Sequence, residues 1–374
     1  IPIETVSAIY ERFLKRGDKR KEKPNIPDEN IPKREGVFYT PRFLAELVLD
    51  MALAKTPSLL GHRYLDPACG SGIFLVGLFN RIAEEWKQAN PEAGNDRRAR
   101  ELRKILCDSI CGVDINPTAC RISAFSLYLA YLDQLSPPDI QELQQKGHKL
   151  PGLVHFPESG RRGDIEGNIW CGDFFAEDAE YPVDADLVVG NPPWGSTAVD
   201  GTPAAKWCTD PDHLYPVPDK QIAAAFVWKA THHAVDTGRI CLVLPAGTLF
   251  NHSTTALEFQ RTFFQRQAVD HVLNLADYQR FLFEEAGHPA LVIDYQKKPP
   301  VNHQHSVQYW APKADWLVTR AEVIAIIPED RCTVSVGQVL QDLEGPDAPQ
   351  IWKQRYWATP RDWRLIDRLS LYPR

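Results

Sequence analysis

Residues 66–86 read DPACGSGIFLVGLFNRIAEEW, and this stretch decides the fold class. The apolar run RYLD (63–66) that leads into it has the length of a buried strand. Residues 70–72, GSG, form a tight turn, and from Ile73 onward the residues read as a helix. A strand, a turn and a helix in this order are typical of a parallel sheet covered by helices. The turn is neither the GxGxxG dinucleotide fingerprint nor a phosphate-binding GxxxxGK(S/T) loop.

Three later apolar stretches end as RYLD does, in a polar residue before a turn. ICGVD ends at Asp114, NIWCGD at Asp173 and DLVVGN at Asn191. Ligands of open parallel sheets bind outside the carboxyl ends of the strands, so these side chains and Asp66 are expected to face one cleft. A single acid there would be an ordinary turn residue. Four in order predict a ligand site.

Composition narrows the class of protein. The 374 residues provide for one or two domains, and the formal charge of −7 argues against nucleic-acid binding over the whole surface, although not against a local basic groove. No apolar run has the length of a membrane span, and no signal peptide is visible. The eight cysteines have no metal-ligand spacing, which favours reduced thiols in a cytoplasmic protein without a metal site. The start at Ile1, with Met51 as the only methionine, predicts a piece of a longer protein.

The chain divides into three regions. Residues 1–35 combine a short amphipathic helix (1–14) with a charged, proline-broken linker. Residues 36–298 alternate between strand-like and helix-like stretches, which predicts an α/β domain with a doubly wound, mostly parallel sheet. Residues 299–374 read as an irregular, tryptophan-rich extension.

The order of the motifs resembles that of the N6-adenine DNA methyltransferases, above all the methylase portion of large bacterial restriction–modification or phage-defence enzymes. The motifs are FYTP (38–41), DPACGSG (66–72), GVDINP (112–117), CGDFF (171–175) and NPPW (191–194). The resemblance implies an adenine-specific DNA methyltransferase with a seven-stranded Rossmann-like sheet, a final antiparallel hairpin and S-adenosylmethionine bound across the strand ends. Because FYTP comes first, it also implies that residues 299–374 connect to a target-recognition domain beyond the chain.

For the methionine end of the cofactor, the resemblance implies roles near the start of the domain. Tyr39 and Thr40 would lie beside it, with Thr40 capping a helix whose first turn holds Pro41. Asp66 would hold the ammonium group. The backbone of the turn would pass close to the cofactor at Ala68, Gly70 and Gly72.

For the adenosine end, the resemblance implies a second set of contacts. Asp114 would accept hydrogen bonds from the ribose hydroxyls, and Ile115 would lie against the adenine ring. Asp173 would accept from the adenine amino group of the cofactor. Phe174 would pack nearby, although an ordinary core position explains this aromatic residue equally well.

The tetrapeptide NPPW has the composition needed to activate an exocyclic amine, whose lone pair is delocalised into its ring. If the side-chain oxygen of Asn191 and the carbonyl of Pro192 accept the two N–H bonds, the lone pair is freed to attack a methyl group. Pro192 and Pro193 stiffen the backbone, so the acceptors need little reorganisation. An amine in duplex DNA is reached by flipping the base, on which Trp194 would stack.

A second aromatic contact to the flipped base is expected from RFLFEEAGHPALVIDYQK (280–297). Phe283 is the candidate and Phe281 the alternative, with core packing as the competing interpretation of either ring. Residues 195–220 show no periodicity, so they are expected to be a long loop that closes over the base or is disordered without DNA.

Other functions also fit the tetrapeptide. Protein-glutamine and guanine-N2 RNA methyltransferases use Asn-Pro-Pro-aromatic as well, usually with Tyr or Phe in place of Trp194, and they lack FYTP. A non-catalytic scaffold that binds the cofactor is a third reading, which the intact NPPW disfavours. A nuclease upstream of Ile1, on the same longer chain, is compatible with the sequence. The expected partner is double-stranded DNA with a flipped adenine.

Overall fold

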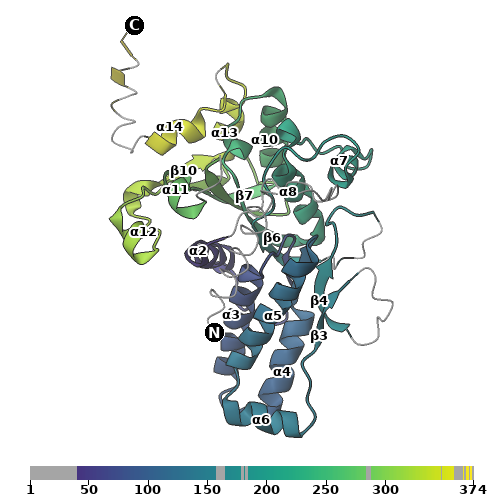
Figure 1. Cartoon of the computed structure of the whole chain (residues 1–374). Coiled ribbons are helices and arrows are strands. Elements are labelled where there is room, and N and C mark those ends of the chain that lie inside the picture. Colours follow the sequence, from purple (N-terminus) through teal and green to yellow (C-terminus); the bar gives the residue numbers. More distant parts are fainter. Residues whose placement is uncertain are drawn as a thin grey trace, which may run out of the picture. The chain divides into compact units, whose positions relative to one another are not determined.

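The computed structural model divides into two compact units, residues 1–191 and 192–374, and each is described by itself (Figure 1). The predicted helix over residues 1–14 and the linker over 15–35 lie outside the described residues. The structure describes residues 40–156, 165–177, 181, 184–283, 288–346, 348–357, 365, 368–369 and 371–372.

The first unit contains a sheet of five parallel strands in the order β5-β1-β2-β4-β3. Their bounds are β1 (Tyr64–Asp66), β2 (Ile110–Asp114), β3 (Gly152–His155), β4 (Ile165–Cys171) and β5 (Ala185–Gly190). β1 lies between β2 and β5, and all three of its residues are buried. Central parallel strands covered on both faces are expected to be apolar throughout. This explains why RYLD and DLVVG show no alternation of polar and apolar residues.

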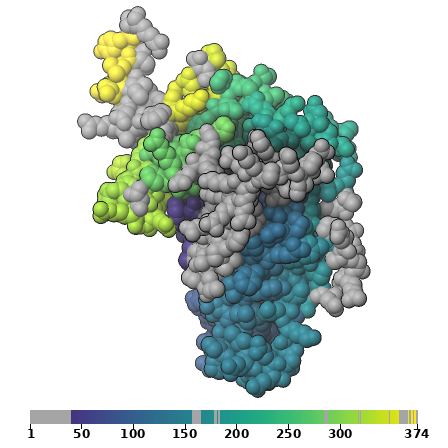
Figure 2. Space-filling view, in the orientation of Figure 1, coloured from purple at the N-terminus to yellow at the C-terminus, as the bar shows by residue number. Residues whose placement is uncertain are grey.

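Helices α3, α4 and α5 of the first unit run side by side, and α6 lies across one end of them (Figure 1). α3 begins after Gly72, whose φ of +85° is in the left-handed region that favours glycine. α5 begins at Pro117, and its cap Asn116 accepts a hydrogen bond from the Thr118 N–H. In the space-filling view, the segment that contains α4, α5 and α6, coloured blue, forms a continuous surface (Figure 2). The helices are α2 (Arg42–Leu53), α3 (Ile73–Ala89), α4 (Asn95–Asp108), α5 (Pro117–Asp133) and α6 (Pro137–Gln145).

In the second unit, the described residues form five strands in the order β10-β9-β7-β8-β6. β8 is antiparallel to both β6 and β7, β9 is parallel to β7, and β10 is antiparallel to β9. The strands are β6 (Ala234–Pro245), β7 (Ala268–Asn274), β8 (Ala290–Gln296), β9 (Ser306–Trp310) and β10 (Arg331–Ser335). The helices are α7 (Pro203–Thr209), α8 (Ile222–His233), α9 (Gly247–Phe250), α10 (Thr254–Arg266), α11 (Gln279–Leu282), α12 (Trp316–Ala321), α13 (Val336–Asp342) and α14 (Ile351–Trp357), with 3-10 turns η2 (Pro218–Lys220), η3 (Ala276–Tyr278) and η4 (Pro328–Asp330).

The predicted α/β class with a mostly parallel sheet and an antiparallel pair of strands is confirmed. The described residues form ten strands, however, rather than seven. Residues 299–374 are also less irregular than expected, because β9 and β10 extend the sheet of the second unit. β9 buries Val307 and Tyr309 in strict alternation, but five residues are too few to mark a strand within a polar stretch.

The expected loop over residues 195–220 has structure of its own. Thr202 caps α7 by accepting from the Ala205 N–H, and Trp228 Nε1 donates to the Pro216 carbonyl. The ring of Tyr215 stacks on Trp228 with centroids 4.8 Å apart. Such a small aromatic core has no sequence period, which is why the pattern predicted a loop. Within the described part of the chain, no helix combines the length and the apolar character that crossing a membrane requires.

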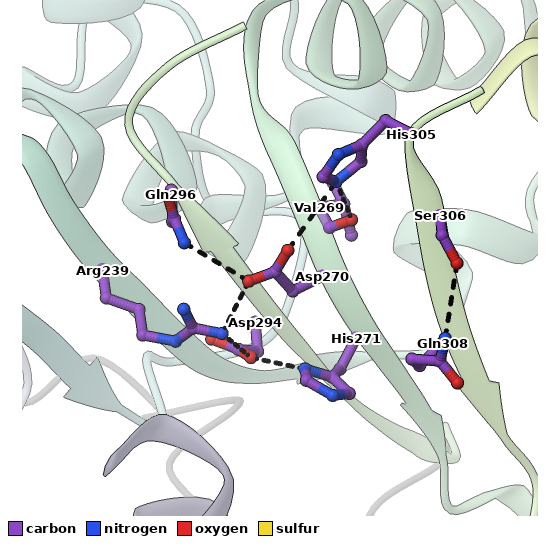
Figure 3. A network of polar contacts seen from close by, with 9 residues as sticks. All are labelled: Arg239, Val269, Asp270, His271, Asp294, Gln296, His305, Ser306 and Gln308. Atoms are coloured by element: carbon purple, nitrogen blue, oxygen red, sulfur yellow. Dashed lines mark hydrogen bonds and ion pairs between the residues drawn. The ribbon is translucent and has the colours of Figure 1, made fainter. Parts of the chain in front are cut away.

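A buried cluster of charges joins three strands of the second unit (Figure 3). Arg239 on β6 lies 2.9 Å from the Asp270 carboxylate on β7 and 2.6 Å from the Asp294 carboxylate on β8. His271 Nδ1 lies 2.7 Å from the same oxygen of Asp294, whose side chain is fully buried. Because each of the three strands supplies at least one partner, the cluster favours a single register among β6, β8 and β7.

Asp294→Asn should lower the free energy of unfolding by about 3 kcal/mol, since removing one partner leaves a buried charge without full compensation. The matched control is Asp236→Asn, because Asp236 on β6 is fully exposed and lies 3.8 Å from Lys297. This variant should unfold as the wild type does. Urea unfolding of the three proteins measures the difference. Equal losses in both variants would show that the cluster does not stabilise the sheet.

Candidate active site

The polar residues predicted at the strand ends lie at one edge of the first unit's sheet. Asp66 is the last residue of β1, Asp114 is the last of β2, and Asn191 directly follows β5. Asp173 comes two residues after β4. Because β5, β1, β2 and β4 are consecutive parallel strands, the structure brings all four side chains to the same edge.

The glycine turn is bonded directly to the acid of the next strand. The Gly70 N–H donates to Asp114 Oδ2 over 2.9 Å, and the Asn116 N–H donates to Oδ1 over 2.7 Å. The two bonds hold both oxygens of the carboxylate and so fix its orientation. Ile115 follows with a side chain that is 65% exposed. A fixed carboxylate beside an exposed apolar side chain suits a sugar hydroxyl pair next to an aromatic base.

Glycine backbone at the strand ends lies close to neighbouring side chains. Gly70 and Gly72 have φ of +52° and +85°. A Cβ at Gly72 would lie 2.6 Å from Ser123 Oγ, and a Cβ at Gly190 would lie 2.5 Å from Asp66 Oδ1. Glycine is therefore required at these two positions.

Asp66 is the most deeply buried of the strand-end acids. Its side chain is 1% exposed, and Oδ1 accepts from the Ala68 N–H over 3.1 Å. Burial, and to a smaller degree the charge of Asp114, raise the pKa of Asp66 to about 8. Such a carboxyl ionises readily only when a cation lies beside it. This is the property expected of a group that receives an ammonium ion.

Thr40 does not cap α2, so that prediction is wrong. The helix starts at Arg42 with Pro41 as its N-cap residue, and the Pro41 carbonyl accepts from the N–H groups of Leu44 and Ala45. Thr40 Oγ1 instead accepts from the side-chain nitrogen of Asn191 over 3.1 Å. The Thr40 hydroxyl therefore bonds to the residue after β5, and α2 has no side-chain cap. Tyr39, predicted beside it, lies outside the described residues.

Asp173 and Phe174 lie in a small aromatic cluster. Asp173 Oδ1 accepts from the Phe175 N–H, and the Asp173 carbonyl accepts from the hydroxyl of Tyr181. The Phe174 ring is 3% exposed and stacks with Tyr181 at a centroid distance of 6.1 Å. Phe174 thus has core contacts, and Tyr181 supports the loop that carries Asp173. The sequence did not single out Tyr181, because nothing near it in the chain marks it.

The rest of the tetrapeptide opens the second unit. The Trp194 ring is 3% exposed and meets the ring of Phe283 edge to face, with centroids 5.1 Å apart. Phe281 is 42% exposed. The structure therefore brings Phe283, rather than Phe281, to Trp194. In the part of the chain that the structure describes, no three His, Cys, Asp or Glu residues form a group suited to a metal ion.

The parallel sheet with polar residues at consecutive strand ends is the arrangement of a Rossmann-like α/β fold, as the sequence predicted. The chain is similar in fold to the methyltransferase subunit of the type I restriction-modification system from Streptococcus thermophilus, with a TM-score of 0.54 and 17% identity. That similarity covers 83% of this chain and 58% of the other.

Two family models match the sequence, the N-6 DNA Methylase model over residues 4–136 and the Eco57I restriction-modification methylase model over residues 108–281. The adenine-specific methyltransferase PglX of Streptomyces coelicolor is 36% identical over 105 residues, which are 27% of this chain and 8% of the relative. The type I restriction enzyme MjaIX methylase subunit of Methanocaldococcus jannaschii is 28% identical over 168 residues, which are 45% of this chain and 20% of the relative. Both models describe methylases, and each matches less than half of the chain, which spans a fifth or less of these two relatives.

The raised pKa of Asp66 predicts how its charge affects folding. The folded state keeps a proton that the unfolded chain releases near a pKa of about 3.9, so the contribution of Asp66 to stability is full below that pH and is lost as the pH rises through about 8. Asp66→Asn cannot titrate. The variant should therefore gain stability relative to the wild type as the pH rises from about 4 to about 8.

Urea unfolding at several pH values measures this difference. Asp108→Asn, which changes an exposed side chain at the end of α4, serves as the control and should show no such trend. A constant difference between Asp66→Asn and the wild type across this range would mean that Asp66 is ionised in the folded protein.

Proposed function

We propose that the chain transfers a methyl group from S-adenosylmethionine to the N6 amine of adenine in DNA, as a site-specific, adenine-specific DNA methyltransferase. The observation that carries this proposal is the position of the Asn191 amide, held by Thr40 at the sheet edge where Asp66 and Asp114 also end their strands. This edge combines a site for a cofactor cation, a site for a sugar, and an acceptor for an amine.

The residues at the edge fit the cofactor. Asp66 would receive its ammonium group, because a buried carboxyl with a raised pKa gains most from a cation. Asp114, already oriented by the Gly70 and Asn116 N–H groups, would accept the ribose hydroxyls, with Ile115 beneath the adenine ring. Asp173 would accept from the adenine amino group. When bound, S-adenosylmethionine supplies an electrophilic methyl group on a sulfonium centre.

The chain's own contribution to the reaction is to make the target nitrogen nucleophilic. An amine that donates one N–H to the Asn191 side-chain oxygen and the other to the Pro192 carbonyl is drawn towards tetrahedral geometry. Its lone pair is then localised and available to the methyl group. Both acceptors are preorganised, the amide by Thr40 and the carbonyl by the stiffness of Pro192 and Pro193. The amine becomes acidic once methylated, so no general base is needed.

DNA is the proposed partner. Reaching an amine inside a duplex requires flipping the base, and Trp194, with Phe283 against it, is the proposed stacking surface. The relatives named above are an adenine-specific methyltransferase and a methylase subunit of a type I restriction enzyme. By analogy, the chain would be the modification part of a restriction-modification or phage-defence system. Nuclease and target-recognition domains would then lie on the same longer protein or on its partners.

Protein glutamine and RNA guanine pose the same lone-pair problem to an Asn-Pro-Pro motif. Both matching family models describe DNA methylases, which favours DNA over these acceptors. An assay with tritiated S-adenosylmethionine and DNA, RNA or protein acceptors tests the proposal. Label in N6-methyladenine of DNA is the expected result, and label confined to RNA or protein would refute it.

Asp114→Ala should weaken binding of S-adenosylmethionine at least about tenfold, because hydrogen bonds to a charged group contribute on the order of 1.5–3 kcal/mol each. Asp108→Ala, at an exposed position that ends α4, is the matched control and should bind as the wild type does. Calorimetry measures both affinities, and circular dichroism checks the fold. Unchanged affinity in a folded Asp114→Ala protein would remove Asp114 from the site.

Asn191→Ala should separate binding from chemistry. The lost contact acts on the target amine, so cofactor affinity should stay close to that of the wild type. The rate of methyl transfer should fall roughly 100- to 1,000-fold, as for other preorganised polar groups. Single-turnover transfer to an adenine-containing duplex measures the rate. A wild-type rate in this variant would show that the tetrapeptide does not activate the amine.

A further inference from the structure

We infer that a basic cluster on the second unit binds the phosphate backbone of the DNA that flanks the target adenine. The basic cluster consists of His213, Lys229, His232 and Lys297. This inference rests on the proposed function, because that function makes DNA the ligand. It adds a third binding surface to the cofactor and base sites described above.

Aromatic rings hold the basic cluster in place where α7 packs beside α8 (Figure 1). The Lys229 ammonium lies 4.8 Å from the ring centroid of Trp207 on α7. The rings of His213 and His232 lie 4.5 and 5.9 Å from the Trp207 ring, measured between centroids. His213 also stacks on Tyr215 at 5.5 Å. Because His232 is exposed and the other rings are only partly buried, the cluster is both held in place and accessible to a ligand.

The positive charges of the basic cluster repel one another. The pKa of His232 is lowered by partial burial and then by positive charge on three neighbours, Lys229, His213 and Lys297. Lys229 and His232 are three positions apart on α8, where like charges destabilise a helix. Asp236 lies 3.8 Å from the Lys297 ammonium, but the Asp236 side chain is fully exposed, so water screens this pair. An anion bound among these cations would relieve their repulsion.

The cluster holds more positive charge than the end of α8 needs. The last carbonyls of a helix carry about half a negative elementary charge. Lys297 already serves them, because its Nζ donates to the Ala234 carbonyl over 2.7 Å and to the His232 carbonyl over 3.5 Å. The charge of Lys229 is additional to this contact. In a chain with a net charge of −7, a local excess of this kind suits a polyanion.

The distance from the proposed stacking ring favours DNA as this polyanion. α8 begins next to Trp194, since the Ile222 N–H donates to the carbonyl of Gly195, the residue after Trp194. At about 1.5 Å per residue, Lys229 and His232 lie about 10 and 15 Å along α8 from its start. Phosphates of one DNA strand are spaced about 3.4 Å apart along the axis. A duplex whose adenine stacks on Trp194 would therefore reach the cluster after about three to five base pairs.

The first test measures the salt dependence of DNA binding. Lys229→Gln/His232→Gln removes charge from the cluster, and the control Arg97→Gln/Lys104→Gln removes two exposed charges from α4. On a duplex of about 30 base pairs, the cluster variant should bind about tenfold more weakly at low salt, and its slope of log K against log salt should be shallower by about 1 to 2. The α4 variant and the charge-retaining Lys229→Arg should bind as the wild type does.

The second test uses methyl transfer to locate the contact along the DNA. Each substrate is a G·C duplex with a single A·T pair, placed about two base pairs from one end or from the other, with about 15 base pairs on the remaining side. The cluster variant should lose about tenfold in kcat/KM on only one of the two substrates. On the substrate that is too short to reach the cluster, it should equal the wild type.

Several results would overturn the inference. One is an unchanged salt slope in the cluster variant, with circular dichroism showing that it is folded, and another is the same change in the α4 variant. An equal loss of kcat/KM on both single-adenine substrates would also contradict it. Loss of affinity for single-stranded RNA, with none for duplex DNA, would assign the surface to RNA instead. If the double variant is unstable, Lys229→Gln alone serves the same comparisons.

The salt slope requires no turnover, so it keeps this inference apart from the proposed function. A shallower slope in the cluster variant, in a chain that forms no N6-methyladenine, would support the DNA-binding surface and refute the proposed reaction. N6-methyladenine formation with equal slopes in the wild type and the cluster variant would do the reverse.

Discussion

The hydrogen bond from the Gly70 N–H to the Asp114 carboxylate is the contact on which the cofactor side of the site depends. It joins the turn after β1 to the end of β2, so two adjacent strands present their polar ends in one fixed arrangement. The left-handed φ of Gly70 turns its N–H towards the acid, and the second oxygen of Asp114 is held by Asn116 at the start of α5. Strand, turn and helix are thereby coupled at the point where a ligand is expected.

Buried acidic side chains have opposite effects on stability in the two units. In the second unit, Arg239 compensates Asp270 and Asp294, and the cluster stabilises one pairing of strands. In the first unit, Asp66 is buried beside Asp114 with no cation among the contacts described for it, and its pKa rises to about 8. Burying a carboxylate in this way opposes folding at neutral pH. A cation carried by a ligand would compensate the Asp66 carboxylate at the sheet edge.

The features that the sequence predicted are local ones. An apolar run, an acid and a glycine turn follow one another within a few residues. The positions of Asp66 and Asp114 at strand ends and the start of α3 can therefore be predicted without any tertiary information. The strands β9 and β10 are not, because a five-residue strand is defined by the partner that it pairs with. Tyr181 and the aromatic packing of Tyr215 on Trp228 depend likewise on neighbours that the local pattern does not reveal.

Thr40 illustrates why a local rule can choose the wrong partner for the right residue. Threonine before proline at a helix start fits an N-cap, and in isolation the nearest free N–H groups are those of the first turn. The folded chain offers Asn191, 151 positions later, and the cap passes to Pro41. α2 thus begins without a side-chain cap, a cost of about 1 kcal/mol in a typical helix. A local pattern can therefore identify Thr40 as a hydrogen-bonding residue, but only the tertiary structure identifies Asn191 as its partner.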